Sequence, residues 1–125
     1  MNIINEFNET CFMFLDLIYT FTNDSDISFY KKAMNKIIQT QNDKIIDQFV
    51  IRCIPYHKEI YDKNKKFFVN LNLQNEFNND DSLLKIIKIK EIFNNLDEDK
   101  INIIFEYLIL LCNYSLEYLK TKKLN

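Results

Sequence analysis

The sequence predicts an all-α fold, a single-domain bundle of five or six helices packed around a central, apolar C-terminal helix. The 125-residue chain has no glycine and one proline, whereas β-sheet folds use glycine in turns that need a positive φ angle. Apolar residues recur every three or four positions along most of the chain, which is the period of an amphipathic helix. The segment from Asp97 to Tyr118 is apolar on nearly all sides, so other helices are needed to cover it.

The composition is that of one globular domain spanning residues 1–125. Hydrophobic residues make up 47% of the chain and charged residues 27%, values typical of folded domains. The absence of glycine excludes P-loops, dinucleotide-binding fingerprints and nucleophile elbows, which need it at a close backbone approach or a strained turn. A net charge of -2 does not indicate a nucleic-acid or membrane partner.

The first half of the chain is expected to form three helices. Apolar spacing predicts the first from Ile4 to a polar turn at residues 23–26, whose side chains can cap a second helix. The second helix is expected to end around residues 39–41. The dipeptide Asn42–Asp43 is well placed to cap a third helix that continues to Cys53.

A proline divides the middle of the chain. Pro55 cannot donate a backbone hydrogen bond, so it is expected to begin a new, short helix over residues 56–61 that runs into residues 63–68. Residues 69–81 alternate apolar and polar side chains over too short a stretch for a sheet. They are expected to form an irregular, flexible connection on the surface.

Two further helices complete the bundle. The pair Asp81–Ser82 is expected to cap the fifth helix, and Asn94–Asn95 to end it with the left-handed geometry that asparagine tolerates. The last helix has acidic Asp97–Glu98 at its start and a basic tail at residues 120–125, and both complement its dipole. Its polar positions form one narrow stripe, made of Asn102, Glu106, Asn113, Glu117 and Lys120.

The chain is expected to be intracellular, neither secreted nor inserted in a membrane. Glu106 interrupts the apolar run of the last helix well short of the roughly 18 to 20 residues that span a bilayer. Cys11, Cys53 and Cys112 lie far apart in apolar helical patterns, as reduced, buried thiols do. The N-terminus lacks the basic region and small-residue cleavage site of a secretory signal.

Catalytic and metal-binding patterns are weak, so no enzyme activity, metal or cofactor is expected. His57 is the one histidine, and helical zinc or di-iron sites normally use more imidazoles or repeated Glu-x-x-His spacing. Cys53 lies four residues before it but belongs to the apolar face of its helix, which disfavours a nucleophilic pair. Acidic residues gather at helix starts, where capping explains them.

Residues 52–68 hold the densest basic cluster, interleaved with aromatic side chains. Basic side chains can contact phosphates and aromatic side chains can stack on bases, so nucleic-acid binding is the alternative function. Glu59 and Asp62 lower the net charge of the segment, which weakens the signal. The candidate nucleic-acid residues are Arg52, Lys58, Lys63, Lys65 and Lys66.

Aromatic residues beside the connection at 69–81 are candidates for protein interaction. Exposed aromatic patches mark contacts with other proteins. The candidates are Phe67, Phe68 and Phe77. Helical spacing favours core burial for Phe67 and Phe68, and Phe77, isolated among polar residues, is the one most expected to be exposed.

The last two thirds of the chain carry a pattern of proline, aromatic pair, polar loop and two hydrophobic-aromatic pairs. Pro55 precedes Tyr56 and Ile60, Phe67 and Phe68 follow, and the segment from Lys90 to Leu111 ends the pattern. Its two pairs are Ile92-Phe93 and Ile104-Phe105, followed by Tyr107 and Leu108. The pattern resembles small uncharacterised helical proteins encoded by giant nucleocytoplasmic large DNA viruses. The resemblance implies a viral protein and assigns no activity or functional residue.

The function predicted from sequence is therefore non-enzymatic protein–protein interaction. The expected partner is another protein, viral or host, or a second copy of the chain. The resemblance implies a virion-associated structural component or a host-directed adaptor. Nucleic-acid binding through residues 52–68 is the alternative.

Overall fold

The computed structural model describes residues 2–71 and 87–123. Helices are the only regular secondary structure in these two stretches, which confirms the all-α prediction. The α-helices are α1 (Ile3–Thr22), α2 (Asp26–Thr40), α3 (Lys44–Arg52), α4 (His57–Tyr61), α5 (Lys65–Asn70), α8 (Ile89–Asn95) and α9 (Glu98–Lys123). A short 3-10 helix, η1 (Ile54–Tyr56), carries Pro55 in its first turn, so the proline begins a helical segment as predicted.

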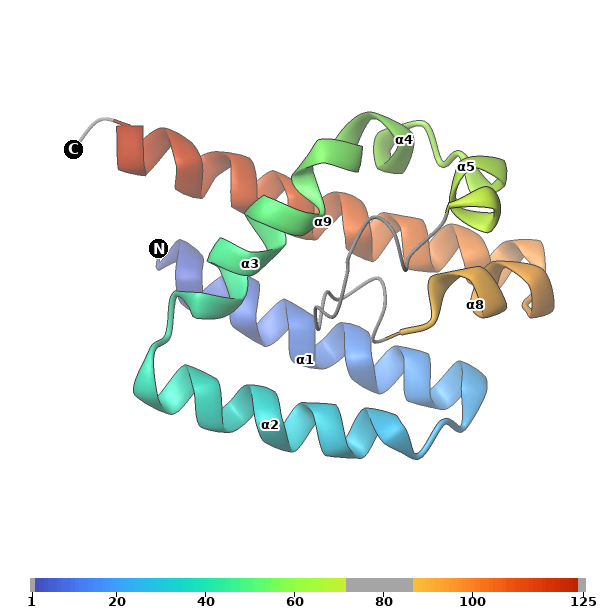
Figure 1. The fold of residues 1–125 in the computed structure, drawn as a ribbon, viewed down its shortest axis with the longest axis horizontal. Coiled ribbons are helices and arrows are strands. Elements are labelled where there is room, and N and C mark those ends of the chain that lie inside the picture. The colour runs from blue at the N-terminus through green and yellow to red at the C-terminus, as the bar shows by residue number, and fades with distance from the viewer. Residues whose placement is uncertain (1, 72–86, 124–125) are drawn as a thin grey trace.

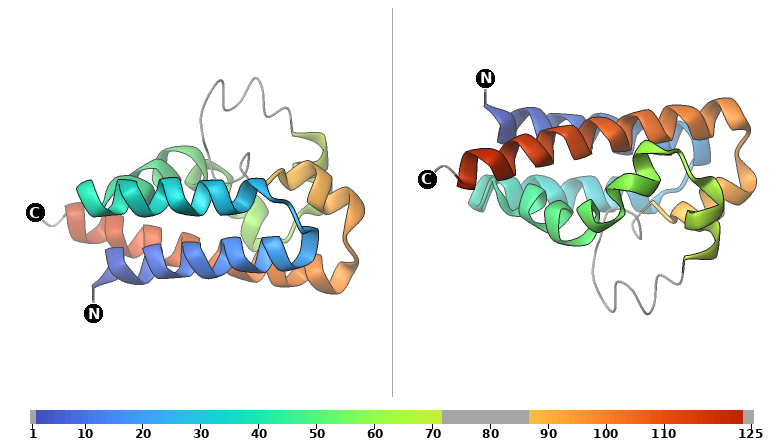
Figure 2. Two further views of the ribbon diagram at one scale, coloured as in Figure 1. Left: turned by 90° about the horizontal axis from the view of Figure 1, so that it is seen from below. Right: turned by 90° about the horizontal axis from the view of Figure 1, so that it is seen from above.

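The long helices α1 and α9 form an antiparallel pair, with α2 on the other side of α1 (Figure 1). Helices α3 and α4 also pack on α9, and α5 packs on α8. Both views in Figure 2 place α1 and α9 along one edge of the molecule and α3, α4, α5 and α8 on the opposite side. One face of the α1–α9 pair is therefore covered by helices, and the other faces outward.

Aromatic rings hold the core together at both ends. Phe68 of α5, Phe93 of α8 and Phe105 of α9 are each at most 1% exposed, and the Phe93 and Phe105 ring centroids lie 4.8 Å apart. At the other end, Phe7 of α1 meets Phe49 of α3 edge to face at 5.4 Å. Such pairs contribute roughly 0.5–1.5 kcal/mol beyond the burial of their area.

Helix α9 contacts α1, α3 and α4 and, through Phe105, the aromatic rings of α5 and α8. The second helix was also expected beside it, but α2 packs on α1 instead, and the apolar sides of α9 are not all covered. Asp97 caps it, since Asp97 Oδ1 accepts a hydrogen bond from the Lys100 amide at 3.0 Å. Leu108 is completely buried, whereas Ile103 is 38% and Leu110 39% exposed. The expectation of complete covering was wrong because α9 lies at the edge of the bundle.

The turns use residues other than glycine in the left-handed region. Asn23 (φ 55°), Lys63 (φ 52°) and Lys88 (φ 56°) adopt positive φ angles. Asn23 ends α1 in this conformation, and its amide donates to the Tyr19 carbonyl at 2.7 Å. The same closure was expected at Asn94–Asn95, which do end α8, but the next residue is extended instead.

Several predicted boundaries differ from the structure. The turn at Lys63 separates α4 from α5, which were expected to be continuous. Residues 69–70 belong to α5 and Leu71 is buried, so the irregular connection does not begin at residue 69. Helix α8 begins at Ile89 after the left-handed Lys88, and residues 120–123, expected to be a basic tail, continue α9. The remainder of the predicted connection, with Phe77 and the cap at 81–82, lies outside the described residues.

Candidate functional site

Two lysines of the basic segment contact polar side chains of α9, Lys63 on its polar stripe and Lys65 at its first residue. Lys63 Nζ donates to Asn102 Oδ1 at 2.6 Å and lies 3.6 Å from Glu106 Oε1. Lys65 Nζ lies 3.1 Å from Glu98 Oε1. Exposed ion pairs of this kind contribute about 0–1 kcal/mol each. These contacts fasten the α4–α5 segment to α9, and carboxylates already compensate both positive charges.

The other three candidate nucleic-acid residues come from three different helices. Arg52 is half-buried in the last turn of α3. Lys58 in α4 and Lys66 in α5 are exposed. Tyr61, the aromatic residue between them, donates a hydrogen bond to Asn113 of α9. The structure thus uses much of the basic-aromatic segment for packing on α9.

Both described aromatic candidates for protein interaction are packed in the fold. Phe68 is 0% exposed, which confirms the preference for core burial. Phe67 is half-buried, with its ring centroid 5.6 Å from that of Tyr56 and 5.1 Å from that of Phe68. Neither ring offers a large free face to a partner.

A different apolar surface lies where α1 meets α9 on the outward side of the pair. Met13 is 56% exposed, and Ile103 and Leu110 are the exposed apolar residues of α9 noted above. Leu17 of α1 and Tyr107 of α9 are half-buried and pack against the core. We call this surface the α1–α9 seam and define it as Met13, Leu17, Ile103, Tyr107 and Leu110.

A stacked ring pair places the two sides of the seam next to each other. The Phe14 and Tyr107 rings lie 5.6 Å apart and are inclined by only 19°. Helical periodicity puts Met13 and Leu17 on the outward side of Phe14. A second contact between the helices, Lys100 Nζ 5.6 Å from the centre of the Phe21 ring, fits the same antiparallel register.

Sequence reasoning missed the seam, although the chain contains a signal for it. Met13 occupies the polar face of its helix, among Glu6, Glu9 and Asp16. The apolar circumference of α9 is also wider than its described neighbours cover. Only the packing shows that these two surplus apolar surfaces adjoin each other.

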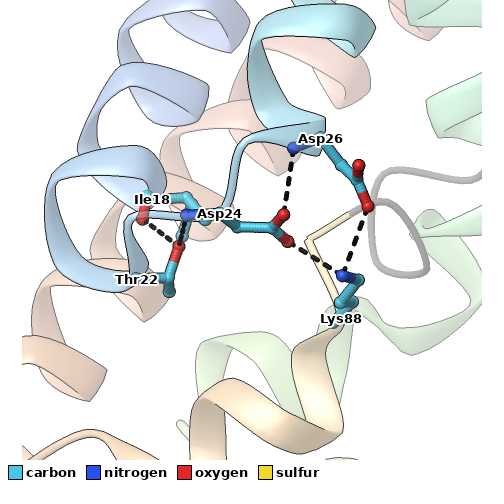
Figure 3. Close-up of polar contacts among 5 residues, drawn as sticks. All are labelled: Ile18, Thr22, Asp24, Asp26 and Lys88. Carbon is cyan, nitrogen blue, oxygen red and sulfur yellow. Dashed lines mark hydrogen bonds and ion pairs between the residues drawn. The ribbon is translucent and has the colours of Figure 1, made fainter.

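A charged cluster joins the α1–α2 turn to the start of α8 (Figure 3). Lys88 Nζ lies 3.0 Å from Asp24 Oδ2 and 3.5 Å from Asp26 Oδ2. Asp24 Oδ1 also accepts a hydrogen bond from the Asp26 amide at 3.0 Å, and Thr22 Oγ1 accepts one from the Asp24 amide at 3.2 Å. Lys88 lowers the pKa of Asp24, and Asp24 raises the pKa of Lys88. Both groups are therefore held in their charged forms, which suits a structural contact.

The groups that catalysis would need are dispersed. His57 is exposed, with Nδ1 2.8 Å from the Ile54 carbonyl oxygen. Cys53 is buried, and burial raises the pKa of the Cys112 thiol to about 12 and that of Cys11 further above its ordinary value. Thiols of this kind are poor nucleophiles because little thiolate forms.

Across residues 2–71 and 87–123, no group of three or more His, Cys, Asp or Glu side chains is placed to hold a metal ion. Among the helices described, none combines the length and the apolar character needed to cross a bilayer.

Comparison of the chain with models of known protein families, with curated proteins and with solved structures finds no match. Of the surfaces described above, the α1–α9 seam is the one where exposed apolar groups gather.

Proposed function

We propose that this chain is a non-enzymatic protein–protein interaction protein that binds its partner through the α1–α9 seam. The observation that carries the proposal is the exposure of Met13, Ile103 and Leu110 around the stacked Phe14–Tyr107 pair. Contiguous exposed apolar surface on a folded domain marks sites of contact with other proteins. Methionine and aromatic residues are also enriched at the cores of such contacts.

Covering the seam with a partner contributes favourably to the free energy of binding. Complete burial of a Met, Leu or Ile side chain contributes about 1.5–3 kcal/mol, and the exposed parts of Met13, Ile103 and Leu110 represent a fraction of that each. The helices beneath are long and well packed, since Leu108 and Phe14 are fully buried. A rigid base of this kind loses little conformational entropy when a partner binds.

This proposal moves the interaction surface away from the place that the sequence suggested. Phe68 belongs to the core, and carboxylates of α9 already compensate Lys63 and Lys65. Protein contact through the seam is therefore better supported than nucleic-acid contact through residues 52–68. The resemblance to proteins of large DNA viruses adds a proposed setting, as a virion-associated component or a host-directed adaptor.

Site-specific photo-crosslinking tests the proposal. A benzophenone amino acid replaces Leu110 in the seam or, as the control, the exposed Asn35 on α2, and the protein is illuminated in the cells that normally make it. We expect a discrete protein adduct from position 110 and none from position 35. Adducts of equal yield from both positions, or none from position 110 in a protein that melts normally, would reject the seam as an interface.

A further inference from the structure

The exposed line of α9 that borders the seam alternates apolar and acidic side chains. Asp99, Ile103, Glu106, Leu110 and Glu117 follow one another at steps of 4, 3, 4 and 7 residues, which places them along one side of a helix. All five are exposed. The apolar residues of the seam on α9 therefore have carboxylates before, between and after them.

The α1 side of the seam is acidic as well. Glu6 and Glu9 lie seven and four residues before Met13, so they share its side of the helix. The sequence of α1, from Ile3 to Thr22, contains no lysine, arginine or histidine. The seam is thus bordered by negative charge on both of its helices.

Lysines moderate this negative charge at three points. Lys63 Nζ lies 3.6 Å from Glu106, and Lys100 Nζ lies 3.8 Å from Asp97 at the start of α9. Lys120 follows Glu117 by one helical turn. Glu6, Glu9 and Asp99 remain beside the seam in addition to these, so its border stays acidic.

We propose that the partner is a basic amphipathic helix of another protein, an inference that rests on the proposed function of the seam. Ile103 and Leu110 are seven residues apart, which is about 10.5 Å along a helix axis. A partner helix matches this distance with apolar residues at positions i and i+7, as helices bound on apolar surfaces do. Lysine or arginine on its flanks meets the carboxylates of both α1 and α9.

Charge also decides against a second copy of this chain as the occupant. Two copies joined through their seams would bring two acidic borders together, and like charges across an interface oppose association. A basic helix gains from the same field, which speeds its encounter with the seam. Screening by salt weakens this gain, so binding is expected to depend on ionic strength.

A selection of displayed peptides tests which side chains a helix needs to bind the seam. Displayed 20-residue helical peptides, with Lys and Glu equally frequent at every polar position, are selected on the intact chain. Peptides that also bind the Leu110→Glu variant are removed. We expect the remaining peptides to carry more Lys than Glu beside an apolar i, i+7 pair. We expect their affinity for a Glu106→Lys/Glu117→Lys variant to be about tenfold lower than for the parent, which corresponds to about 1.4 kcal/mol. Circular dichroism confirms that the variant folds.

Three outcomes overturn the basic-helix inference. If the peptides that depend on Leu110 show no preference for Lys, or prefer Glu, the partner helix is not basic. The absence of any Leu110-dependent peptide removes the helical partner. A dimer in analytical ultracentrifugation that is lost in the Leu110→Glu variant assigns the seam to a second copy. The crosslinking experiment separates these failures from that of the proposed function, because an adduct at position 110 shows protein contact of any kind.

Discussion

At the scale of single residues, Lys88 combines a left-handed backbone with two ionic contacts. For a residue with a side chain, this conformation costs about 1–2 kcal/mol, and Lys88 adopts it at φ 56°. Its ammonium group lies 3.0 Å from Asp24 and 3.5 Å from Asp26. More than 60 positions separate these partners in the chain. Helical periodicity carries no information about such a contact, so only the assembled fold reveals it.

The variant Asp24→Asn tests this contact. Asparagine can still accept the hydrogen bond from the Asp26 amide, so the substitution removes the charge and keeps the turn. We expect the free energy of unfolding at pH 7 to fall by about 0.5–1 kcal/mol, because the pair is partly exposed. Urea denaturation of parent and variant measures the difference.

The difference in the free energy of unfolding between the parent and Asp24→Asn is expected to depend on pH. Lys88 lowers the pKa of Asp24 in the folded state, so the pair contributes fully above the ordinary aspartate pKa of about 3.9. Its contribution is lost as the pH falls through the lowered pKa. Parent and variant are therefore expected to converge in acid. A difference that is the same at neutral and acid pH contradicts the ionic contact, and Asp26→Asn, at the longer distance, serves as the weaker control.

At the scale of elements, the long helices were predictable and the short ones only in part. Apolar periodicity and a polar turn located α1 to within a residue or two of its observed ends, Ile3 and Thr22. The break between α4 and α5 depends on Lys63 at φ 52°, and lysine carries no turn signal. Without glycine in the chain, the usual marker of left-handed turns is missing, so the short helices and their ends were misjudged.

Two substitutions two residues apart on α9 test how this helix is placed. Leu108 is 0% and Leu110 39% exposed. Leu108→Asp buries an unpaired carboxylate at a cost of several kcal/mol, against a total stability of about 5–15 kcal/mol, so we expect it to unfold the chain. Leu110→Asp is expected to change stability by about 0.5 kcal/mol or less. Thermal melting followed by circular dichroism compares them, and equal melting temperatures would contradict the burial of Leu108.

At the scale of the whole molecule, the fold keeps its three cysteines inside and leaves the seam outside. Cys11 of α1, Cys112 of α9 and Cys53, which directly follows α3, are each at most 1% exposed. Their apolar surroundings were predictable from sequence, because each cysteine continues an apolar helical pattern in the sequence. The seam was not predictable from sequence, because the exposure of an apolar helix surface depends on whether another helix packs on it.

Thiol reactivity tests this arrangement of the core. A disulfide reagent at mildly alkaline pH is expected to leave the folded protein almost unreacted, because burial raises the pKa of the Cys112 thiol to about 12 and also raises that of Cys11. All three thiols are expected to react in denaturant. The Asp24→Asn variant is expected to react roughly two- to fivefold faster than the parent when reaction follows the population of opened molecules. A thiol that reacts at once in the native protein contradicts its burial.

The amino-acid sequence by itself determined that the chain is all-helical and where its long helices lie. These properties follow from the absence of glycine and from the spacing of apolar residues, which is a local property of the sequence. The tertiary structure alone decided that Lys63 and Lys65 pair with α9 and that Lys88 joins α8 to the α1–α2 turn. It also decided that Phe14 stacks on Tyr107 while Met13 and Leu110 stay exposed. Burial and ion pairing depend on which distant segments become neighbours, and helical periodicity does not specify that choice.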